Sequence, residues 1–531
     1  MGCQQPAKRE DQRPEAKAQH GACAVELVRT SLRESGCVQW PLRILSNETP
    51  PVGRPEEDHV RRHQEVYPRQ RGRTRTHRGT LVGCLVAALV AGSCSSDDNS
   101  NAQSSPSTST VPSGMTQATA PERQRVDLAE PTFSNPTEVH NPWFPISDLH
   151  SAVILGNEEG DPLKIETTLL PEHETVRLES GEQVELLVSQ FVAYLDGRIH
   201  EVAIDRYAQD DAGNVWYFGE DVFNYEDGVV ADTEGTWIAG KDGPPGMIMP
   251  ADPQVGDAHR PENIPGFVFE EVVIKSINET VEGPRGPVEG AIVGTENHLM
   301  EGHYEDKTFG PGYGEFRSGV GGNLEAMALA VPIDTVPGGV PANLEAVSRA
   351  ASDIFRAAES GDWESAASSF SAMQAAWSAH QESTHVPPLL SIQMNRTLNA
   401  LAGDDTVPAL DAHNAEGTRS SALHVAQAAL DLELQYRSPL EVDLARFKIW
   451  AEATVLDGGS GEADSGLVAA DIAALDWTWD RISNTFDTAD ASDIDAHLKD
   501  LRAAADDEDT GAAATGATRL LEALTRSRAA A

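Results

Sequence analysis

The sequence predicts an α+β protein in which an antiparallel, curved β-sheet of half-barrel or barrel-like form is followed by an all-α helical bundle. Residues 126–332 are rich in valine, glycine, aspartate and aromatic residues with frequent turn sequences, which is typical of short strands joined by tight turns. Residues 343–531 are instead rich in alanine and leucine at helical spacing. Residues 333–342 contain prolines and a glycine pair, which is typical of a linker. Because no stretch alternates strands with helices, we expect no doubly wound nucleotide-binding fold.

An export signal is predicted over residues 66–93. Arginines precede an apolar stretch, residues 81–91, that is shorter than the ~20 residues needed to span a bilayer. The residues just before Cys94 resemble the lipobox of bacterial lipoproteins. We therefore expect cleavage before Cys94, attachment of a lipid to its thiol, and a location on the outer face of the cell membrane. An ordinary secretory signal cleaved elsewhere, or a short uncleaved anchor, is the alternative.

The segments on either side of this signal are predicted to lack a fold. Residues 1–65 mix charge, proline and glutamine without helical or strand periodicity, which indicates disorder or an extension that is not translated. Residues 94–125 are mostly small and polar and are expected to form a flexible tether behind the lipidated Cys94. No cysteine follows Cys94 in the sequence, so we expect no disulfide in the exported part.

The charge of the chain limits its partners. The formal net charge is −44 at pH 7, and a strongly acidic protein repels nucleic acid and anionic lipid headgroups. We therefore expect no nucleic-acid partner, and contact with the membrane through the lipid on Cys94. A small molecule or a component of the cell envelope is the expected partner. We expect no cofactor.

The strands are expected to follow one another as a meander. An apolar run over residues 183–195 is followed by a turn at residues 196–197 and a returning strand over residues 199–204. Two further turns, at residues 210–214 and 226–228, separate β-prone runs. Strands joined by short turns favour a curved sheet.

Aromatic residues of the central hairpin are the candidates for contacting a ligand. Either Trp216 and Phe218 or their neighbours Val215 and Tyr217 are expected to cover the inner face of the sheet, because successive side chains of a strand point to opposite faces. The aromatic residues of this run are Trp216, Tyr217 and Phe218. Together with Tyr207 on the preceding strand, these residues form the predicted ligand-binding set.

Four sequence motifs in this part of the chain resemble those of a known protein family. They are NPWFP at residues 141–145, YAQDDAGNVWYFGED at 207–221, GTWIAGKDGPPGMIMPADPQVGD at 235–257 and EDKTFGPGYGEF at 305–316. Together they resemble the signatures of a family of exported bacterial lipoproteins with the hairpin motif DWYAQDxxGNVWYFGED and no assigned activity. The resemblance implies export and a curved sheet. The chain departs from the family pattern at residues 205–207 and 308–309.

The C-terminal part is expected to contain six to eight helices in an up-and-down or irregular bundle. Apolar residues recur at helical spacing after Asp362, which is placed to cap the first of these stripes, and again over residues 423–434 and 444–451. Ser492 to Asp495 resembles a capping box and predicts a helix start there. The tryptophans of these stripes are interpreted as core residues first and as a ligand surface second.

The turn at residues 210–214 has two interpretations. Asp210, Asp211, Gly213 and Trp216 fit most of the spacing D-x-G-x-x-W of an Asp box, which is a structural hairpin turn. Asp210, Asp211 and Asn214 could alternatively supply oxygen ligands to calcium. The structural turn is the favoured interpretation.

Histidines suggest two further metal sites. His298, Glu301 and His303 lie within six residues, but on one strand the two histidines would point to opposite faces, and a helix would pair them poorly. We therefore favour an exposed strand end. His424 and Asp431 share a helix face and could hold a metal, although a buried salt link or a solvated face is favoured.

The expected function is non-enzymatic binding of a ligand or partner at the cell envelope. One alternative is a hydrolase for a glycan or an ester, in which Asp205 and Glu220 face each other across the hairpin as paired carboxylates. The other alternative is a purely structural envelope protein. No Gly-x-Ser-x-Gly elbow is present in the sequence to support a serine nucleophile.

Overall fold

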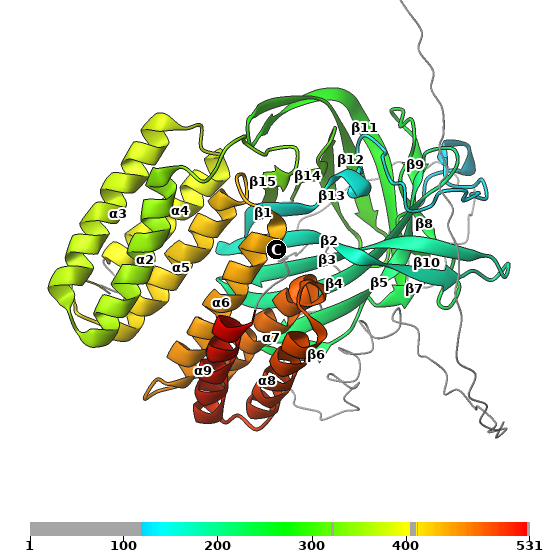
Figure 1. The fold of residues 1–531 in the computed structure, drawn as a ribbon. Helices are drawn as coiled ribbons and strands as arrows, with labels where there is room; N and C mark the ends of the chain where they lie inside the picture. Colours follow the sequence, from blue (N-terminus) through cyan, green and yellow to red (C-terminus); the bar gives the residue numbers. More distant parts are fainter. Residues whose placement is uncertain (1–117, 320–322, 404–409, 411, 528–531) are drawn as a thin grey trace, which may run out of the picture. The chain divides into compact units, whose positions relative to one another are not determined.

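In the computed structural model, an antiparallel sheet is followed by helices, which confirms the predicted α+β class (Figure 1). The structure describes residues 118–319, 323–403, 410 and 412–527. These residues all belong to one compact unit, Arg54–Ala531. Cys94, the predicted export signal, residues 1–65 and most of the expected tether lie outside the described residues.

The described part of the sheet contains fifteen strands. They are β1 (Ser151–Glu158), β2 (Asp161–Arg177), β3 (Gln183–Leu195), β4 (Arg198–Gln209), β5 (Val215–Glu226), β6 (Val229–Asp232), β7 (Trp237–Ile238), β8 (Gly246–Met249), β9 (Ala258–His259), β10 (Asn263–Ile264), β11 (Val268–Gly283), β12 (Gly286–His298), β13 (His303–Gly310), β14 (Gly314–Ser318) and β15 (Leu324–Val331).

The sheet is an open, curved meander. Its first and last strands in chain order, β1 and β15, pair with each other in the middle of the sheet. Its order is β10-β11-β12-β13-β14-β15-β1-β2-β3-β4-β5-β6, and all of these neighbours are antiparallel. In the central pair, Ser151 of β1 lies opposite Val331 of β15. The short strands β7 and β8 pair with β5, and β9 pairs with β11. The two ends of the sheet are therefore β6 and β10, which lie near the middle of the strand-forming part of the sequence.

Alternate residues of the strands divide between two faces of the sheet. On β2, Ile165 lines a cavity together with Glu315 of β14, so side chains from both arms of the curved sheet meet on this inner face. Leu170, on the opposite face of β2, packs in a buried cluster with Trp477 of a later helix. This division follows from the two-residue period of a strand. The outer face of β2 to β5 is therefore covered by helix, while the inner face surrounds cavities.

Eight helices lie in the described part after the sheet. They are α2 (Ala342–Ser360), α3 (Trp363–Ser383), α4 (Pro388–Ala402), α5 (Ala415–Glu433), α6 (Pro439–Gly458), α7 (Ser465–Ile482), α8 (Thr488–Asp506) and α9 (Thr510–Arg526). Among the described residues, no helix combines the length and the apolar character that crossing a membrane requires.

Side-chain caps fix where several of these helices begin. The Asp362 carboxylate accepts a hydrogen bond from the Ser365 amide, which confirms the predicted cap of α3. The capping box predicted at Ser492 is wrong, because α8 already begins at Thr488. The Asp487 side chain caps that helix, so Ser492 lies inside it.

A buried ion network joins β2 to the helices. The Glu166 carboxylate lies 2.9 Å from both Lys164 Nζ and Arg481 Nη1, and 3.2 Å from Arg446 Nε. Arg446 also pairs with Asp431 at 2.7 Å. Burial alone would raise the pKa of Glu166, but Arg446, Lys164 and Arg481 hold it below its usual value. The carboxylate stays charged, and the network ties β2 to α5, α6 and α7.

Candidate functional site

The inner face of the sheet encloses a cavity of about 120 Å³, here called the inner cavity. Its walls are mainly apolar and come from β1, β2, β3, β15 and the segment before β1. Examples of its lining residues are Ile154, Ile165, Phe191, Met327 and Phe144. An apolar cavity of ~150 Å³ in a protein core is large enough for benzene. The inner cavity therefore has room for the apolar part of a small molecule.

Carboxyl groups interrupt the apolar lining of the inner cavity. Asp205, Glu315 and Glu325 all line it. Burial raises the pKa of Asp205 to about 6, although a hydrogen bond from the Tyr217 hydroxyl opposes this shift. Burial, and then the nearby charge of Glu315, raise the pKa of Glu325 to about 7. The cavity therefore holds acids that titrate near neutral pH and that a positive charge would stabilise in their ionised form.

A second, smaller cavity continues from the first along the inner face. It shares Ile248 and Glu315 with the inner cavity, and it encloses about 20 Å³. Its lining is strongly acidic. The carboxylates here are called the acidic cluster, which consists of Glu220, Glu262, Glu270, Glu296, Glu305 and Glu315.

Lys307 of β13 lies within the acidic cluster and is almost fully buried. Its Nζ is 2.6 Å from Glu296, 3.7 Å from Glu305 and 3.9 Å from Glu315. Burial, offset in part by Lys307, raises the pKa of Glu296 to about 7 and that of Glu305 to about 9. Several carboxyl groups thus share one ammonium, and burial together with the surplus of negative charge favours the protonated form of some of them. Such a cluster favours an additional cation over an anion or a neutral group.

The structure pairs Asp205 and Glu220 as the sequence predicts. The two residues are directly opposite each other on β4 and β5. Asp205 lines the inner cavity and Glu220 lines the smaller one. The two carboxyl groups therefore lie where the cavities meet.

The four predicted ligand-binding aromatics divide between the two faces. Tyr207 lines the inner cavity and Tyr217 lines the smaller cavity. The Trp216 indole nitrogen instead donates a hydrogen bond to Asp210 at 2.9 Å. Phe218 packs edge-to-face against Phe133 at a ring distance of 5.7 Å. Only the two tyrosines of this set line a described cavity, and all four side chains are buried.

The residues considered for calcium form a hydrogen-bonded turn. Asp210 Oδ1 accepts hydrogen bonds from the amides of Ala212 and Asn214, and Oδ2 accepts them from Asn214 Nδ2 and Trp216 Nε1. Asn214 Oδ1 accepts one from the Ala251 amide. The carboxylate of Asp211 accepts hydrogen bonds from the Ser134 amide and hydroxyl. These oxygens are thus used in fixing the turn, which agrees with the favoured interpretation.

The structure gives His424 and Asp431 separate surroundings. Asp431 is fully buried and pairs with Lys164 at 2.8 Å and with Arg446 at 2.7 Å. His424 is exposed on the same helix, α5. Asp431 is therefore part of a buried salt link, the interpretation favoured from the sequence.

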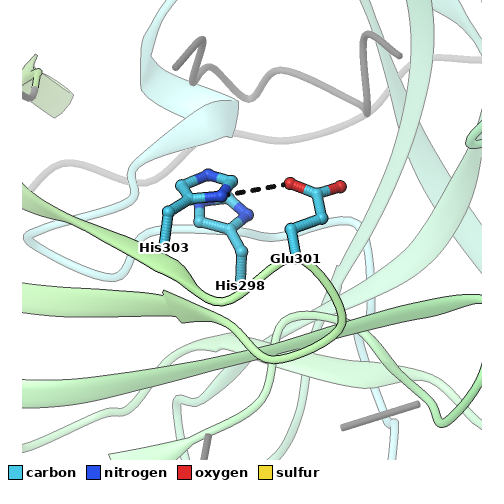
Figure 2. A group of neighbouring side chains, drawn as sticks. All are labelled: His298, Glu301 and His303. Carbon is cyan, nitrogen blue, oxygen red and sulfur yellow. Dashed lines mark ion pairs between the residues drawn. The ribbon is translucent and has the colours of Figure 1, made fainter. Parts of the chain in front are cut away.

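The structure contradicts the expectation that His298 and His303 point to opposite faces. A turn over residues 299–302 separates the two histidines, so they end β12 and begin β13 as cross-strand partners. Their rings stack at a centroid distance of 4.1 Å, with Glu301 facing them from the turn (Figure 2). The expectation was wrong because it assumed one continuous strand. This histidine pair lies beside the acidic cluster, since His298 Nδ1 is 2.7 Å from Glu270.

Sequence reasoning missed most of the acidic cluster. Glu296, Glu305 and Glu315 belong to three successive strands, and each resembles a solvated position when its strand is considered alone. The available signal was the alternation of charged residues along β13, where Glu305 and Lys307 are two residues apart and therefore lie on one face. No protein-family model matches the chain, and no curated protein matches it significantly.

Proposed function

We propose that the protein is a membrane-anchored, extracytoplasmic binding protein whose inner cavity holds a small molecule with an apolar body and a positively charged group. One observation carries this proposal. An apolar cavity and an acidic cluster adjoin on the same inner face, with Glu315 lining both. Pockets of this kind use apolar walls for affinity and a few placed polar groups for orientation and selectivity.

The acidic residues that line the inner cavity support a cationic ligand. Burial raises the pKa of Asp205 to about 6 and, with the charge of Glu315, that of Glu325 to about 7. An ammonium group in the inner cavity would offset the cost of ionising these buried acids and keep both carboxylates ionised. An anionic ligand would instead add like charge to a buried acidic site, which costs free energy.

The expected location rests on the sequence. A lipid on Cys94 and a polar tether would hold the binding domain at the outer face of the membrane. In that position the protein could collect an amphipathic molecule from the envelope.

The test compares ligands of one chain length that differ in charge. Hexylammonium, 1-hexanol and hexanoate are titrated into the purified protein by calorimetry. We expect hexylammonium to bind at least about tenfold tighter than hexanoate, which corresponds to ~1.4 kcal/mol. Equal binding of the three ligands, or tighter binding of hexanoate, would contradict the proposal, and no binding of any would favour a structural role.

Variants then connect the selectivity to the cavity. Glu315→Gln combined with Glu325→Gln should reduce the affinity for hexylammonium to that for 1-hexanol. Glu179→Gln is the matched control, because Glu179 is exposed and does not line either cavity. A loss of affinity in the control as well would indicate a general charge effect.

A hydrolase remains the second candidate because Asp205 and Glu220 are cross-strand partners at the junction of the cavities. Paired carboxylates serve as acid and base in glycoside hydrolysis. This candidate requires turnover of a glycan or an ester by the purified protein, with loss of turnover in Asp205→Asn and in Glu220→Gln. Turnover that survives both substitutions would exclude these residues.

A further inference from the structure

The turn between β12 and β13 brings two histidines and a glutamate together. His298 and His303 are cross-strand partners, and Glu301 lies on the turn between them. One ligand atom from each of these side chains lies within 4.8 Å of the others. Figure 2 shows the stacked rings with the Glu301 carboxylate facing His303.

His298 is already oriented for metal coordination. Its Nδ1 is 2.7 Å from a carboxylate oxygen of Glu270, which fixes the ring and directs Nε2 away from Glu270. The side chain is buried, and Nε2 makes no hydrogen bond within the described part of the chain. Histidines that bind metals commonly donate their other ring N–H to a carboxylate in this way. A buried ring nitrogen without a hydrogen bond is otherwise costly, and Nε2 has only longer contacts of 3.9 Å to Glu296 and 4.0 Å to Glu305.

We propose that His298, Glu301 and His303 bind a divalent transition-metal ion of the zinc class. Zinc bonds of ~2.1 Å in a tetrahedral site place neighbouring ligand atoms about 3.4 Å apart. His303 Nδ1 and Glu301 Oε2 are 3.3 Å apart, which already fits this spacing. The Nε2 of His298 must approach by a rotation of the stacked rings. Imidazole ligands select zinc, nickel, cobalt or copper over magnesium and calcium.

The surroundings leave room for the ion. A cavity of about 80 Å³ is lined by Glu262, Glu270, His298 and Glu301. The Glu301 side chain is about half exposed, so it can adjust its position and leave access for water. The adjacent acidic cluster adds negative charge. This charge favours the binding of a dication to the imidazoles over their protonation.

A deeper set of ligands competes with this assignment. Glu296, His298 and Glu305 also bring their ligand atoms within 4.8 Å of one another. However, Lys307 Nζ is 2.6 Å from Glu296 and 3.7 Å from Glu305, so an ammonium already neutralises these two carboxylates. Because this ammonium lies against the carboxylates of the deeper set, we assign the metal to the set on the turn. This inference does not depend on the ligand proposed for the inner cavity.

The experiment measures metal uptake by the purified protein after dialysis against a chelator. Bound Zn²⁺ is counted by elemental analysis, and Co²⁺ is used as a spectroscopic probe of tetrahedral coordination. The decisive quantity is the difference between wild type and variant, because cysteines elsewhere in the sequence can also take up zinc. We expect His303→Ala to lose one equivalent of zinc and the corresponding cobalt absorbance.

The control and the second variant keep the test independent of folding. His173→Ala should retain the full stoichiometry, because His173 of β2 also faces a carboxylate, that of Glu185 at 3.0 Å, but is not part of this histidine pair. Glu301→Gln changes a half-exposed side chain and should weaken zinc binding at least about tenfold. Glu270→Gln should weaken it by ~10–100-fold, as expected for a residue that positions a metal ligand.

Two results would overturn the assignment. One is wild-type zinc content that neither His303→Ala nor Glu301→Gln reduces. The other is binding that survives in His303→Ala and tightens in Lys307→Met, which would place the ion in the deeper set.

Discussion

The Tyr217 hydroxyl donates a hydrogen bond of 2.7 Å to the Asp205 carboxylate across β4 and β5. Asp205 lines the inner cavity, whereas Tyr217 lines the smaller acidic cavity. This bond therefore lies at the boundary between the apolar and acidic parts of the inner face. It also stabilises the ionised form of a buried acid.

Removal of this hydrogen bond should raise the pKa of Asp205. In Tyr217→Phe we expect that pKa to rise above its present value of about 6, because burial then acts without the opposing bond. The free energy of unfolding above pH 8 should fall by about 1.5–3 kcal/mol, as for a hydrogen bond to a charged group. Carboxyl NMR titration and urea unfolding measure the two effects. Tyr304→Phe, at an exposed position, should change neither.

The stability of the protein should fall as the pH rises from about 5 to about 7. Glu325 and Glu296 have ordinary pKa values of 4.5 that are raised to about 7 in the folded protein. The folded state therefore binds more protons than the unfolded state over this range, so raising the pH favours unfolding. Urea unfolding at a series of pH values tests this. Glu325→Gln should be less sensitive to pH and more stable than wild type at pH 8, and an unchanged slope would contradict the assignment.

Breaking the ion network between sheet and helices should be strongly destabilising. Arg446→Met leaves the buried carboxylates of Glu166 and Asp431 with fewer partners. We expect the free energy of unfolding to fall by about 3–5 kcal/mol, as for removal of one partner of a buried ion pair. Arg356→Met, which breaks an exposed pair with Asp353, should cost less than about 1 kcal/mol. Comparable losses in the two variants would show that the buried network is weak.

The turn between β5 and β6 should be intolerant of a side chain at Gly228. A Cβ there would lie 2.2 Å from the Gly466 carbonyl oxygen and 2.4 Å from the Ala470 nitrogen of α7. Gly160 also has a positive φ, but a Cβ there would meet no atom within 4 Å. Gly160→Ala should cost about 1–2 kcal/mol for the backbone alone, and Gly228→Ala roughly 1–3 kcal/mol more. Thermal unfolding of both variants measures the difference, and equal losses would contradict this contact.

Local sequence signals predicted the hairpins but not the acidic cluster on the inner face of the sheet. The turns at Asp196-Gly197 and Asp227-Gly228 join β3 to β4 and β5 to β6, and the turn at residues 210–214 joins β4 to β5 in the register that places Asp205 opposite Glu220. Turn chemistry acts over a few residues and is therefore visible in the sequence. The acidic cluster also brings Glu220 of β5 next to carboxylates of β11 to β14, and no local pattern determines this approach between strands that are distant in the sequence.

Two local errors also have physical causes. The turn at residues 299–302 contains Met300 and Glu301 and has no Asn-Gly or Asp-Gly pair, so the hairpin that joins His298 to His303 gave little signal. Several acidic residues near the start of α8 compete as caps, and Asp487 is used in place of Ser492.

The pairing of β1 with β15 constrains the order of folding. β1 cannot complete its hydrogen bonds on one edge until β15, which ends at residue 331, is available, so pairing over this long sequence separation is expected to be slow. Val153 of β1 and Leu329 of β15 then join α2 to α6 in one buried cluster, so this cluster also waits for the strands to meet. Until then β1 presents an unpaired edge to neighbouring chains, and aggregation competes with folding.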